Sequence, residues 1–291
     1  MAIARLSAMV GFSGTSNVAA ARRFGLRPVG TMAHSYIEAF PTEPEAFRAF
    51  ASDFPQRTTF LVDTYDTLTG VAHAIDLIKG LGLQQRSGIR LDSGDLAVLA
   101  RDARRMLDHA GLQAVQIFVS GGLDEHDLAG LVDAGAPVDA AGVGTRLGVS
   151  ADAPYLDSAY KLVAYAERAV AKLSTGKQTL PGAKQVFRAP GCRDVIALRG
   201  EVPPNVAAAL LQPVMHDGRR VIPPAAWQQG RRWFEADLAE LPAAAARLVD
   251  PQAPVATISP QLQQLTEQTQ TELREQIQVD RRTTPSTSPL V

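Results

Sequence analysis

Short β-type runs that alternate with helix-patterned segments are the feature that most constrains the fold of this chain. The β-type runs lie near residues 30, 60, 90, 117 and 140, and segments with helical patterning separate them. A spacing of roughly 25–30 residues is the length of one βα unit, and consecutive βα units build a parallel sheet or a barrel. The pattern therefore predicts an α/β fold over the first half of the chain.

Five units do not close an eight-stranded barrel. Either the barrel is smaller and irregular, or strands come from elsewhere, or the chain lacks its beginning. After residue 158 the pattern changes to short alternating runs, a basic stretch and a polar, Gln-rich helix, followed by a Thr/Ser/Pro-rich tail over 279–291 that is typical of disorder. We expect three parts. Residues 1–158 would form an α/β barrel domain, and residues 159–260 a mixed α+β part that completes both the barrel and a sheet domain. Residues 261–291 would form a polar helix with a tail.

Composition excludes several classes of protein. The net charge of −1 excludes a broad basic surface for nucleic acid. The single cysteine, Cys192, excludes an internal disulfide and a cysteine-based zinc site, and it suits a reducing compartment. No run approaches the roughly 18 apolar residues of a membrane span, and the first ten residues do not resemble a signal peptide. We expect a cytoplasmic protein with no nucleic-acid or membrane partner.

Chemically useful residues follow the expected strands. The run Ile89–Leu91 opens directly into Asp92, Ser93, Gly94 and Asp95, and a helix-patterned segment begins at about Leu96. Arg90 offers a forked cation, and the two aspartates can take sugar hydroxyls or Mg²⁺. The alternative is structural: Ser93 or Asp95 caps the helix, and Arg90 pairs with a nearby carboxylate. Other expected strands end in His34, Asp63, Ser120 and the Gly142–Gly144 turn, so these residues would gather at one rim.

His34 follows a short run that we interpret as a strand. Gly30 and Ala33 leave space around it, while Thr31 and Ser35 supply hydroxyl groups. Such a setting suits a histidine that accepts or passes a chemical group, although an isolated histidine is more often structural. The remaining histidines are interpreted as solvated: His73, His109, His126 and His216.

Two further segments favour phosphate binding without establishing it. The segment from Gly142 to Arg146 combines bare amide groups with a hydroxyl and a cation, but it matches neither common glycine-rich phosphate motif and can equally be a simple turn. The basic stretch from Lys172 to Arg188 can place cations near a pyrophosphate or can be an ordinary solvated loop. Asp63 to Asp66 can bind a metal or ribose, or cap the helix that begins at Thr67.

Taken together, six segments in this order resemble the nicotinate phosphoribosyltransferase family. The resemblance covers roughly residues 8–190 and rests on Gly11–Asn17, Gly30–Ser35, Leu61–Asp66, Ile89–Asp95, Gly142–Thr145 and Lys172–Val186. It implies a type II phosphoribosyltransferase fold, which is an irregular α/β barrel beside a mixed sheet domain. It also implies a homodimer.

The resemblance further implies an activity and a set of site residues. The reaction joins nicotinate to phosphoribosyl pyrophosphate, giving nicotinate mononucleotide and pyrophosphate, with ATP hydrolysis and Mg²⁺. His34 would be the histidine that ATP phosphorylates, and Asp92 a second catalytic residue that takes ribose hydroxyls or Mg²⁺. Thr31 and Arg90 would contact nicotinate, while Gly144 and Thr145 would bind the phosphate of the phosphoribosyl group; no further metal ligands are assigned.

One departure from the family pattern bears on activity. Family members carry a sizeable region before the first motif, whereas here only about ten residues precede it. We expect a truncated form or a fragment. The alternatives are a related enzyme acting on nicotinamide or quinolinate, and a truncated, non-catalytic paralogue.

Overall fold

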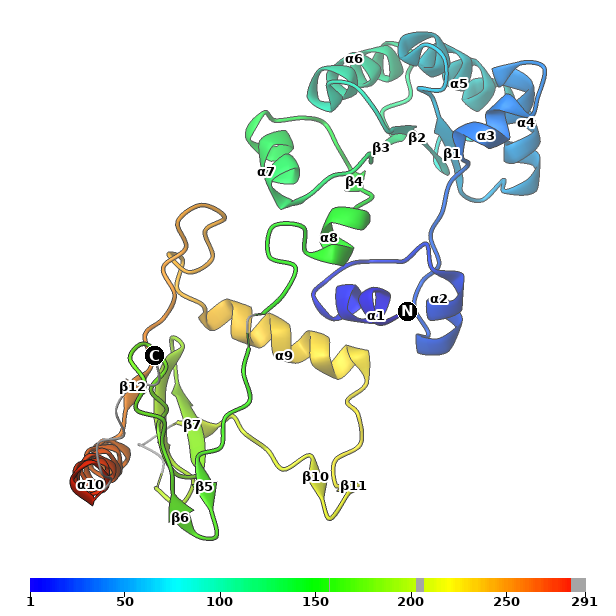
Figure 1. Cartoon of the computed structure of the whole chain (residues 1–291). Coiled ribbons are helices and arrows are strands. Elements are labelled where there is room, and N and C mark those ends of the chain that lie inside the picture. The colour runs from blue at the N-terminus through cyan, green and yellow to red at the C-terminus, as the bar shows by residue number, and fades with distance from the viewer. Residues whose placement is uncertain (157, 203–206, 284–291) are drawn as a thin grey trace, which may run out of the picture. The chain divides into compact units, whose positions relative to one another are not determined.

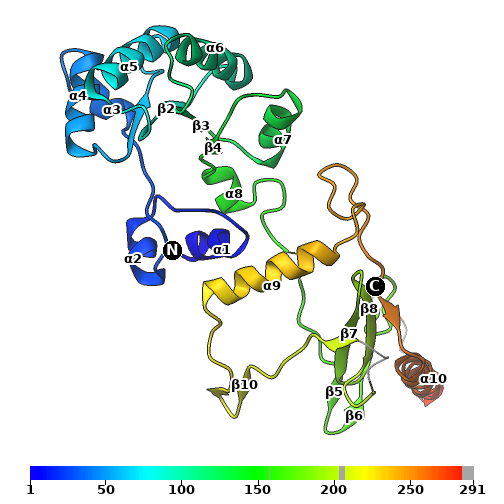
Figure 2. The ribbon, with the colours of Figure 1, turned by 180° about the vertical axis from the view of Figure 1, so that it is seen from behind.

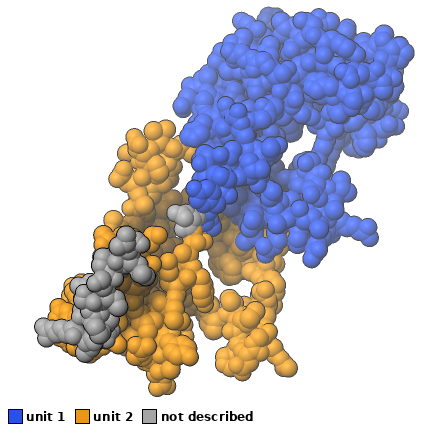
Figure 3. All heavy atoms as spheres, in the orientation of Figure 1, with its two compact units in different colours: residues 1–156 blue, residues 157–291 orange. Residues whose placement is uncertain are grey.

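The computed structural model describes residues 1–156, 158–202 and 207–283 and divides the chain into two compact units, Met1–Leu156 and Asp157–Val291 (Figure 3). The three-part division expected from the sequence, with limits at residues 158 and 260, stays a prediction.

A four-stranded parallel sheet organises the first unit. Its strands lie in chain order, each parallel to the next, with Phe60 opposite Ile89 and Ile89 opposite Ile117. The strands are β1 (Thr58–Leu61), β2 (Ser87–Leu91), β3 (Gln116–Val119) and β4 (Ala140–Ala141). Among the described residues β1 and β4 are the two edges of this sheet. The expected strands near residues 60, 90, 117 and 140 are therefore confirmed, as is the α/β character of this part.

Helices between the strands bury one face of the sheet. Figure 1 shows α4, α5 and α6 along the outer side of β1–β3, and the reverse view in Figure 2 shows α5 and α6 side by side. Phe47, Ile78 and Leu107 from these helices are fully buried together with strand residues Ile89 and Ile117. The helices of this unit are α1 (Ala2–Met9), α2 (Val18–Phe24), α3 (His34–Glu38), α4 (Glu43–Asp53), α5 (Thr67–Leu81), α6 (Leu96–His109), α7 (Glu125–Asp133) and α8 (Thr145–Val149).

Capping side chains and a glycine mark the ends of several helices. Asn17 accepts a hydrogen bond from the Ala20 amide at the start of α2, and Gly25 ends that helix with a φ of +63°. Asp66 caps α5 and Asp95 caps α6 through their side-chain carboxylates. Each carboxylate satisfies backbone N–H groups that have no acceptor within the helix.

The predicted strand before His34 is wrong. Residues 29–33 belong to no strand, and the one bridge in this neighbourhood joins Thr15 to Pro28. The run is extended, but β1 lies at the sheet edge and pairs only with β2 among the described residues. His34 is instead the first residue of α3, with Ala33 in extended conformation before it. Helix α4 begins at Glu43, and the side chain of Thr42 before it makes no cap hydrogen bond.

Close approach of α5 to β1 depends on Gly70. A Cβ atom at this position would lie 2.1 Å from the carbonyl oxygen of Val62, which belongs to the backbone and cannot move aside cheaply. We expect Gly70→Ala to lower the free energy of unfolding of the chain by about 3 kcal/mol, measured by urea denaturation. Gly80→Ala in the same helix is the control, since nothing lies within 4 Å there, and it should stabilise by up to about 1 kcal/mol. Equal effects of the two changes would contradict this packing.

The second unit contains a mixed sheet in the order β12-β8-β7-β9. β7 and β8 form an antiparallel hairpin, and β12 runs parallel to β8. Two short antiparallel pairs, β5 with β6 and β10 with β11, accompany the sheet. The elements are β5 (Ala164–Tyr165), β6 (Arg168–Ala169), β7 (Lys184–Ala189), β8 (Arg193–Leu198), β9 (Ala208–Ala209), β10 (Met215–His216), β11 (Arg219–Arg220), α9 (Trp227–Glu240), β12 (Thr257–Ile258) and α10 (Pro260–Thr283).

Three expectations for this unit need correction. The short alternating runs expected after residue 158 begin with an antiparallel pair, β5 with β6, that spans only two residues on each strand. The end of the basic stretch is not loop, because Lys184–Ala189 pairs along its whole length with β8. The tail expected over 279–291 begins as helix, since α10 continues to Thr283; its remaining residues, 284–291, lie outside the described part.

Candidate functional site

Six polar residues at one rim of the parallel sheet are joined by direct contacts, and we call them the strand-end cluster; four of them, His34, Asp63, Asp92 and Ser120, were predicted to gather there. They lie at or beyond the carboxyl ends of β1, β2 and β3 or in the segment leading into α3. The cluster consists of Thr31, His34, Asp63, Arg90, Asp92 and Ser120.

Arg90 is the hub of the strand-end cluster. Its neighbours Ile89 and Leu91 are fully buried in the core, so strand alternation turns Arg90 to the opposite face of the sheet. Its Nε donates to Ser120 Oγ at 2.7 Å, its Nη1 to Thr31 Oγ1 at 2.8 Å, and its Nη2 to Asp92 Oδ1 at 2.5 Å. A single guanidinium therefore ties two strand ends to the segment before α3.

Asp92 is held in its ionised form. Burial raises the pKa of this carboxyl group, but hydrogen bonds from Ser120 and Arg90, together with the charges of Arg90 and His34, outweigh burial and leave the pKa below its usual value. The sequence offered a structural alternative in which Arg90 pairs with a nearby carboxylate, and the structure contains this pair.

Asp63 links the end of β1 to the turn after β2. Its Oδ2 accepts hydrogen bonds from the Asp92 amide at 2.8 Å and from Ser93 Oγ at 2.7 Å. Its Oδ1 is buried and has no hydrogen-bond partner among the described residues. Ser93 therefore supports Asp63, while Asp95 is the residue that caps α6.

His34 stands at the edge of the cluster, with its side chain 39% exposed. Its Nδ1 lies 3.1 Å from Thr64 Oγ1, and its Nε2 lies 3.8 Å from Asp92 Oδ2. The hydroxyl on one side and the carboxylate on the other orient the ring, and its exposure leaves it accessible to a substrate.

The glycine turn begins beside the cluster, but Thr145 does not join it. The Gly142 amide donates to the Val119 carbonyl at 2.8 Å, and a Cβ at Gly142 would lie 3.4 Å from Ser120 Cβ. Among the described residues, no hydrogen bond connects Gly144 or Thr145 to the strand-end cluster; Thr145 is exposed at the first position of α8.

Three of the cations expected near phosphate are paired within the protein. Arg146 binds Asp124 at 2.7 Å and Asp127 at 3.0 Å. In the second unit Lys184 donates to two backbone carbonyl groups, and Arg188 binds Asp194. Burial lowers the pKa of Lys184. These contacts give the three cations structural partners that the sequence pattern did not reveal.

An ion pair in the same unit has no signal in the sequence. The Glu43 side chain is 5% exposed, and its Oε2 lies 2.8 Å from Nδ1 of His73, whose side chain is 36% exposed. The interpretation of His73 as solvated is therefore incomplete, because the ring is half-buried and paired. Glu43 Oε1 is buried without a hydrogen-bond partner among the described residues. The pKa of Glu43 is raised overall, mainly because burial disfavours its charged form. The hydrogen bond and charge of His73 lower this pKa, while the charges of Asp63 and Asp66 raise it further.

This raised pKa predicts a pH-dependent effect of Glu43→Gln. Because the folded state holds the proton more tightly than the unfolded state does, Glu43 lowers stability as pH rises from its ordinary pKa of 4.5 through its raised value. Glutamine keeps an oxygen acceptor for His73 and carries no charge. We expect Glu43→Gln to raise the free energy of unfolding at pH 7 by about 1 kcal/mol, with the gain disappearing near pH 4, as measured by urea denaturation across pH. A gain that grows toward low pH would contradict this sign.

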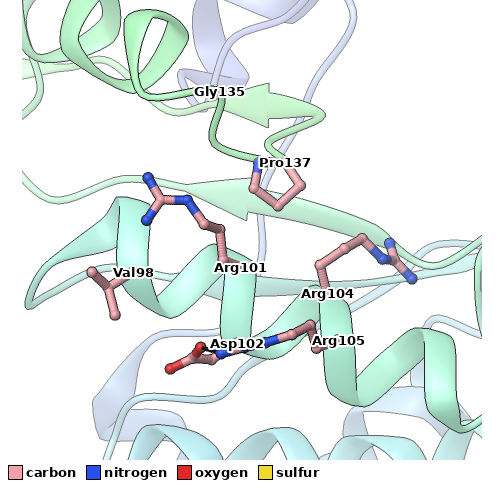
Figure 4. Close-up of a pocket in the computed structure, with 7 residues that line it drawn as sticks. All are labelled: Val98, Arg101, Asp102, Arg104, Arg105, Gly135 and Pro137. Carbon is pink, nitrogen blue, oxygen red and sulfur yellow. Dashed lines mark hydrogen bonds and ion pairs between the residues drawn. The ribbon is translucent and has the colours of Figure 1, made fainter.

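A hollow of about 540 Å³ on the helical side is not part of this site (Figure 4). Figure 4 shows the guanidinium groups of Arg101 and Arg104 pointing in opposite directions, so they do not converge on one anion. Arg104 binds Asp108 and two backbone carbonyl groups, and Arg105 pairs with Asp102. The lining residues are Val98, Arg101, Asp102, Arg104, Arg105, Gly135 and Pro137, and none belongs to the strand-end cluster.

Comparisons with known proteins point to one family. Residues 2–147 match the model of the nicotinate phosphoribosyltransferase (NAPRTase) family. The chain is 48% identical over 246 residues to nicotinate phosphoribosyltransferase pncB2 of Mycobacterium tuberculosis H37Rv, covering 82% of this chain and 52% of that protein. It is 44% identical over 193 residues to nicotinate phosphoribosyltransferase of Bacillus subtilis, covering 64% of this chain and 39% of that protein.

Comparison of the fold with solved structures points to the same family. The crystal structure of human nicotinic acid phosphoribosyltransferase superposes with a TM-score of 0.77 at 26% identity, over 91% of this chain and 66% of that chain. Nicotinate-nucleotide pyrophosphorylase from Pyrococcus furiosus superposes with a TM-score of 0.70 at 28% identity, over 82% of this chain and 62% of that chain. These likenesses confirm the expected phosphoribosyltransferase fold class.

In the ranges that the structure describes, no helix is both long and apolar enough to traverse a bilayer.

The chain spans about half the length of the Mycobacterium tuberculosis relative, 52%. The family match over residues 2–147 includes every residue of the strand-end cluster. The chain therefore belongs to the nicotinate phosphoribosyltransferase family.

Proposed function

We propose that this chain carries nicotinate phosphoribosyltransferase activity, in which nicotinate and phosphoribosyl pyrophosphate give nicotinate mononucleotide and pyrophosphate. The observation that carries the proposal is the convergence of Thr31, His34, Arg90 and Asp92 in one cluster at the carboxyl ends of parallel strands. Ligands of α/β folds bind at this end of the sheet. The names of the two bacterial relatives point to the same reaction.

In this proposal Arg90 and Thr31 orient nicotinate, and Asp92 holds the ribose. The ring nitrogen of nicotinate attacks C1 of the ribose while the C1–oxygen bond to pyrophosphate breaks. Arg90 Nη1 also faces the Met32 carbonyl at 3.5 Å, a weak contact that the nicotinate carboxylate can replace with a charge-assisted bond. The Asp92 carboxylate, kept ionised by its neighbours, accepts hydrogen bonds from ribose hydroxyls and favours the positive charge that develops on the sugar.

ATP and Mg²⁺ complete the proposal. A ring nitrogen of His34 takes the γ-phosphoryl group of ATP, ADP leaves, and water later releases phosphate from the histidine. Asp63 and Asp92 would hold Mg²⁺ together with pyrophosphate oxygens, an arrangement typical of this ion. Asp63 Oδ1, which has no hydrogen-bond partner among the described residues, fits such a donor set. Bound Mg²⁺ would supply charge for the leaving pyrophosphate. Gly144 and Thr145 would bind the 5-phosphate, and the enzyme would act as a cytoplasmic homodimer.

The test is formation of nicotinate mononucleotide by the purified chain, with and without ATP. Nicotinate, nicotinamide and quinolinate are offered as separate substrates. Turnover of nicotinate alone supports the proposal. Turnover of nicotinamide or quinolinate in its place would assign a related phosphoribosyltransferase, and no turnover of any of the three would favour a non-catalytic paralogue.

His34→Ala tests the ATP step. We expect this variant to lose ATP stimulation while it keeps some ATP-independent transfer, because the other cluster residues still bind both substrates. The measurement is the rate of nicotinate mononucleotide formation at matched substrate concentrations, with and without ATP. His126→Ala is the control, since His126 is an exposed residue of α7. Unchanged ATP coupling in His34→Ala would reject the role of His34.

A further inference from the structure

Ser120 connects the two charged residues at the centre of the strand-end cluster. It follows β3 directly and is 8% exposed. Its Oγ lies 2.7 Å from Arg90 Nε and 2.5 Å from Asp92 Oδ1. A buried hydroxyl with two charged partners is costly to disturb, because both partners would lose a hydrogen bond.

The direction of these two hydrogen bonds is determined by chemistry. A guanidinium can only donate and an ionised carboxylate can only accept, so Ser120 Oγ accepts from Arg90 and donates its single hydrogen to Asp92. Arg90 Nη2 donates to the same Asp92 Oδ1. Asp92 Oδ1 thus receives two hydrogen bonds, and Oδ2 is the oxygen that lies 3.8 Å from His34 Nε2.

The backbone holds Ser120 in register with Asp92. The Ser120 amide donates to the Leu91 carbonyl at 2.9 Å, which extends the pairing of β2 and β3 by one residue. The next residue, Gly121, lies so close that a Cβ there would be 1.9 Å from the Asp92 carbonyl oxygen. The hydroxyl therefore acts on Asp92 from a rigid position.

We propose that Ser120 is a positioning residue for phosphoribosyl transfer, which holds Asp92 through Oδ1 so that Oδ2 faces His34 and the sugar. This inference rests on the proposed function and adds a residue to it. Ser120→Ala should lower kcat for nicotinate mononucleotide formation by about 10–100-fold, the effect typical of residues that orient a reactive group, with a smaller change in KM.

The same variant should change the surroundings of the Asp92 carboxylate. The charged groups around Asp92 are Arg90 on β2, His34 on α3 and Asp63 after β1. Loss of the Ser120 hydrogen bond leaves Asp92 Oδ1 with the hydrogen bond from Arg90 Nη2, so the carboxylate is less firmly oriented toward the sugar. A lower kcat with a smaller change in KM is the expected sign of this loss.

Two matched variants separate positioning from loss of stability. Ser120→Thr keeps the hydroxyl, and the absence of a side chain at Gly142 leaves space for the added methyl group. Ser87→Ala removes another buried hydroxyl from the other end of β2, where Ser87 Oγ donates to the Leu83 carbonyl. Ser120→Thr should restore kcat. Ser87→Ala should lower stability and leave kcat unchanged.

The deciding experiment measures kcat and KM of the full chain and its variants, together with the ¹³C chemical shift of the Asp92 carboxylate at a single pH of about 7, with the signal assigned from Asp92→Asn. A changed Asp92 chemical shift in Ser120→Ala, absent in Ser87→Ala, supports the contact, and an unchanged shift overturns it. The kinetics then test the catalytic part, since a changed shift with unchanged kcat would overturn positioning. If the unmodified chain makes no nicotinate mononucleotide, the proposed function fails and the catalytic role of Ser120 fails with it, whereas the chemical shift still decides the contact.

Discussion

An Arg90→Lys variant is expected to lose phosphoribosyl transfer by about 100-fold or more, the loss that misplacement of reacting groups by about 1 Å can cause. Arg90 donates through three nitrogens to Ser120, Thr31 and Asp92. An ammonium group has the same charge but cannot span these three acceptors in one plane, so an Arg-to-Lys change is not conservative here. The measurement is the kcat/KM for nicotinate mononucleotide formation.

Arg86→Lys is the matched control for this prediction. Arg86 lies at the opposite end of β2, is exposed, and donates to Gln56 at 3.0 Å. It should retain the rate of the unmodified chain, with a change in stability below about 0.5 kcal/mol. If Arg90→Lys retained full activity, Arg90 would not be the group that organises the site.

Gly121→Ala is expected to have the largest effect on stability. Gly121 has a φ of +104°, and a Cβ there would lie 1.9 Å from the carbonyl oxygen of Asp92. Either the turn after β3 must move away from the end of β2, or the backbone of Asp92 must shift. We expect a loss of more than about 3 kcal/mol in the free energy of unfolding, because strained backbone and steric overlap act together. Urea denaturation measures this loss, and the Asp92 carboxylate signal in NMR reports displacement of the site.

Gly122→Ala is the control for backbone strain alone. Gly122 also has positive φ, +69°, but nothing lies within 4 Å of the place that a Cβ would take. Its substitution should lower the free energy of unfolding by about 1 kcal/mol, because alanine disfavours the left-handed conformation. Similar losses in the two variants would show that the close approach of Gly121 to Asp92 is unimportant.

Local signals account for the elements that sequence reasoning predicted well. Helix α5 runs from Thr67 to Leu81 as its apolar spacing indicated, with Asp66 at its start and Gly82 at its end. The strands β2 and β3 are predictable because apolar β-type runs there are bounded by turn residues. In each case the determining contacts lie within a few residues of one another along the chain.

Non-local contacts explain the failures. The run before His34 has the composition of a strand but no neighbouring strand among the described residues, so it remains unpaired. Lys184–Ala189 carries basic residues yet forms a strand, because Arg188 pairs with Asp194 across the hairpin. His73 and Glu43, which lie 30 positions apart, form a partly buried pair that no local pattern encodes.

By itself the sequence determined the βα order, most helix boundaries, and the residue types at the ends of the strands, since hydrophobic spacing and capping act over short distances. Only the tertiary structure decided that Arg90 binds Thr31, Asp92 and Ser120 together, and that Thr145 stays outside this group. The physical reason is that parallel pairing places residues about thirty positions apart in adjacent strands, and register then selects which side chains meet.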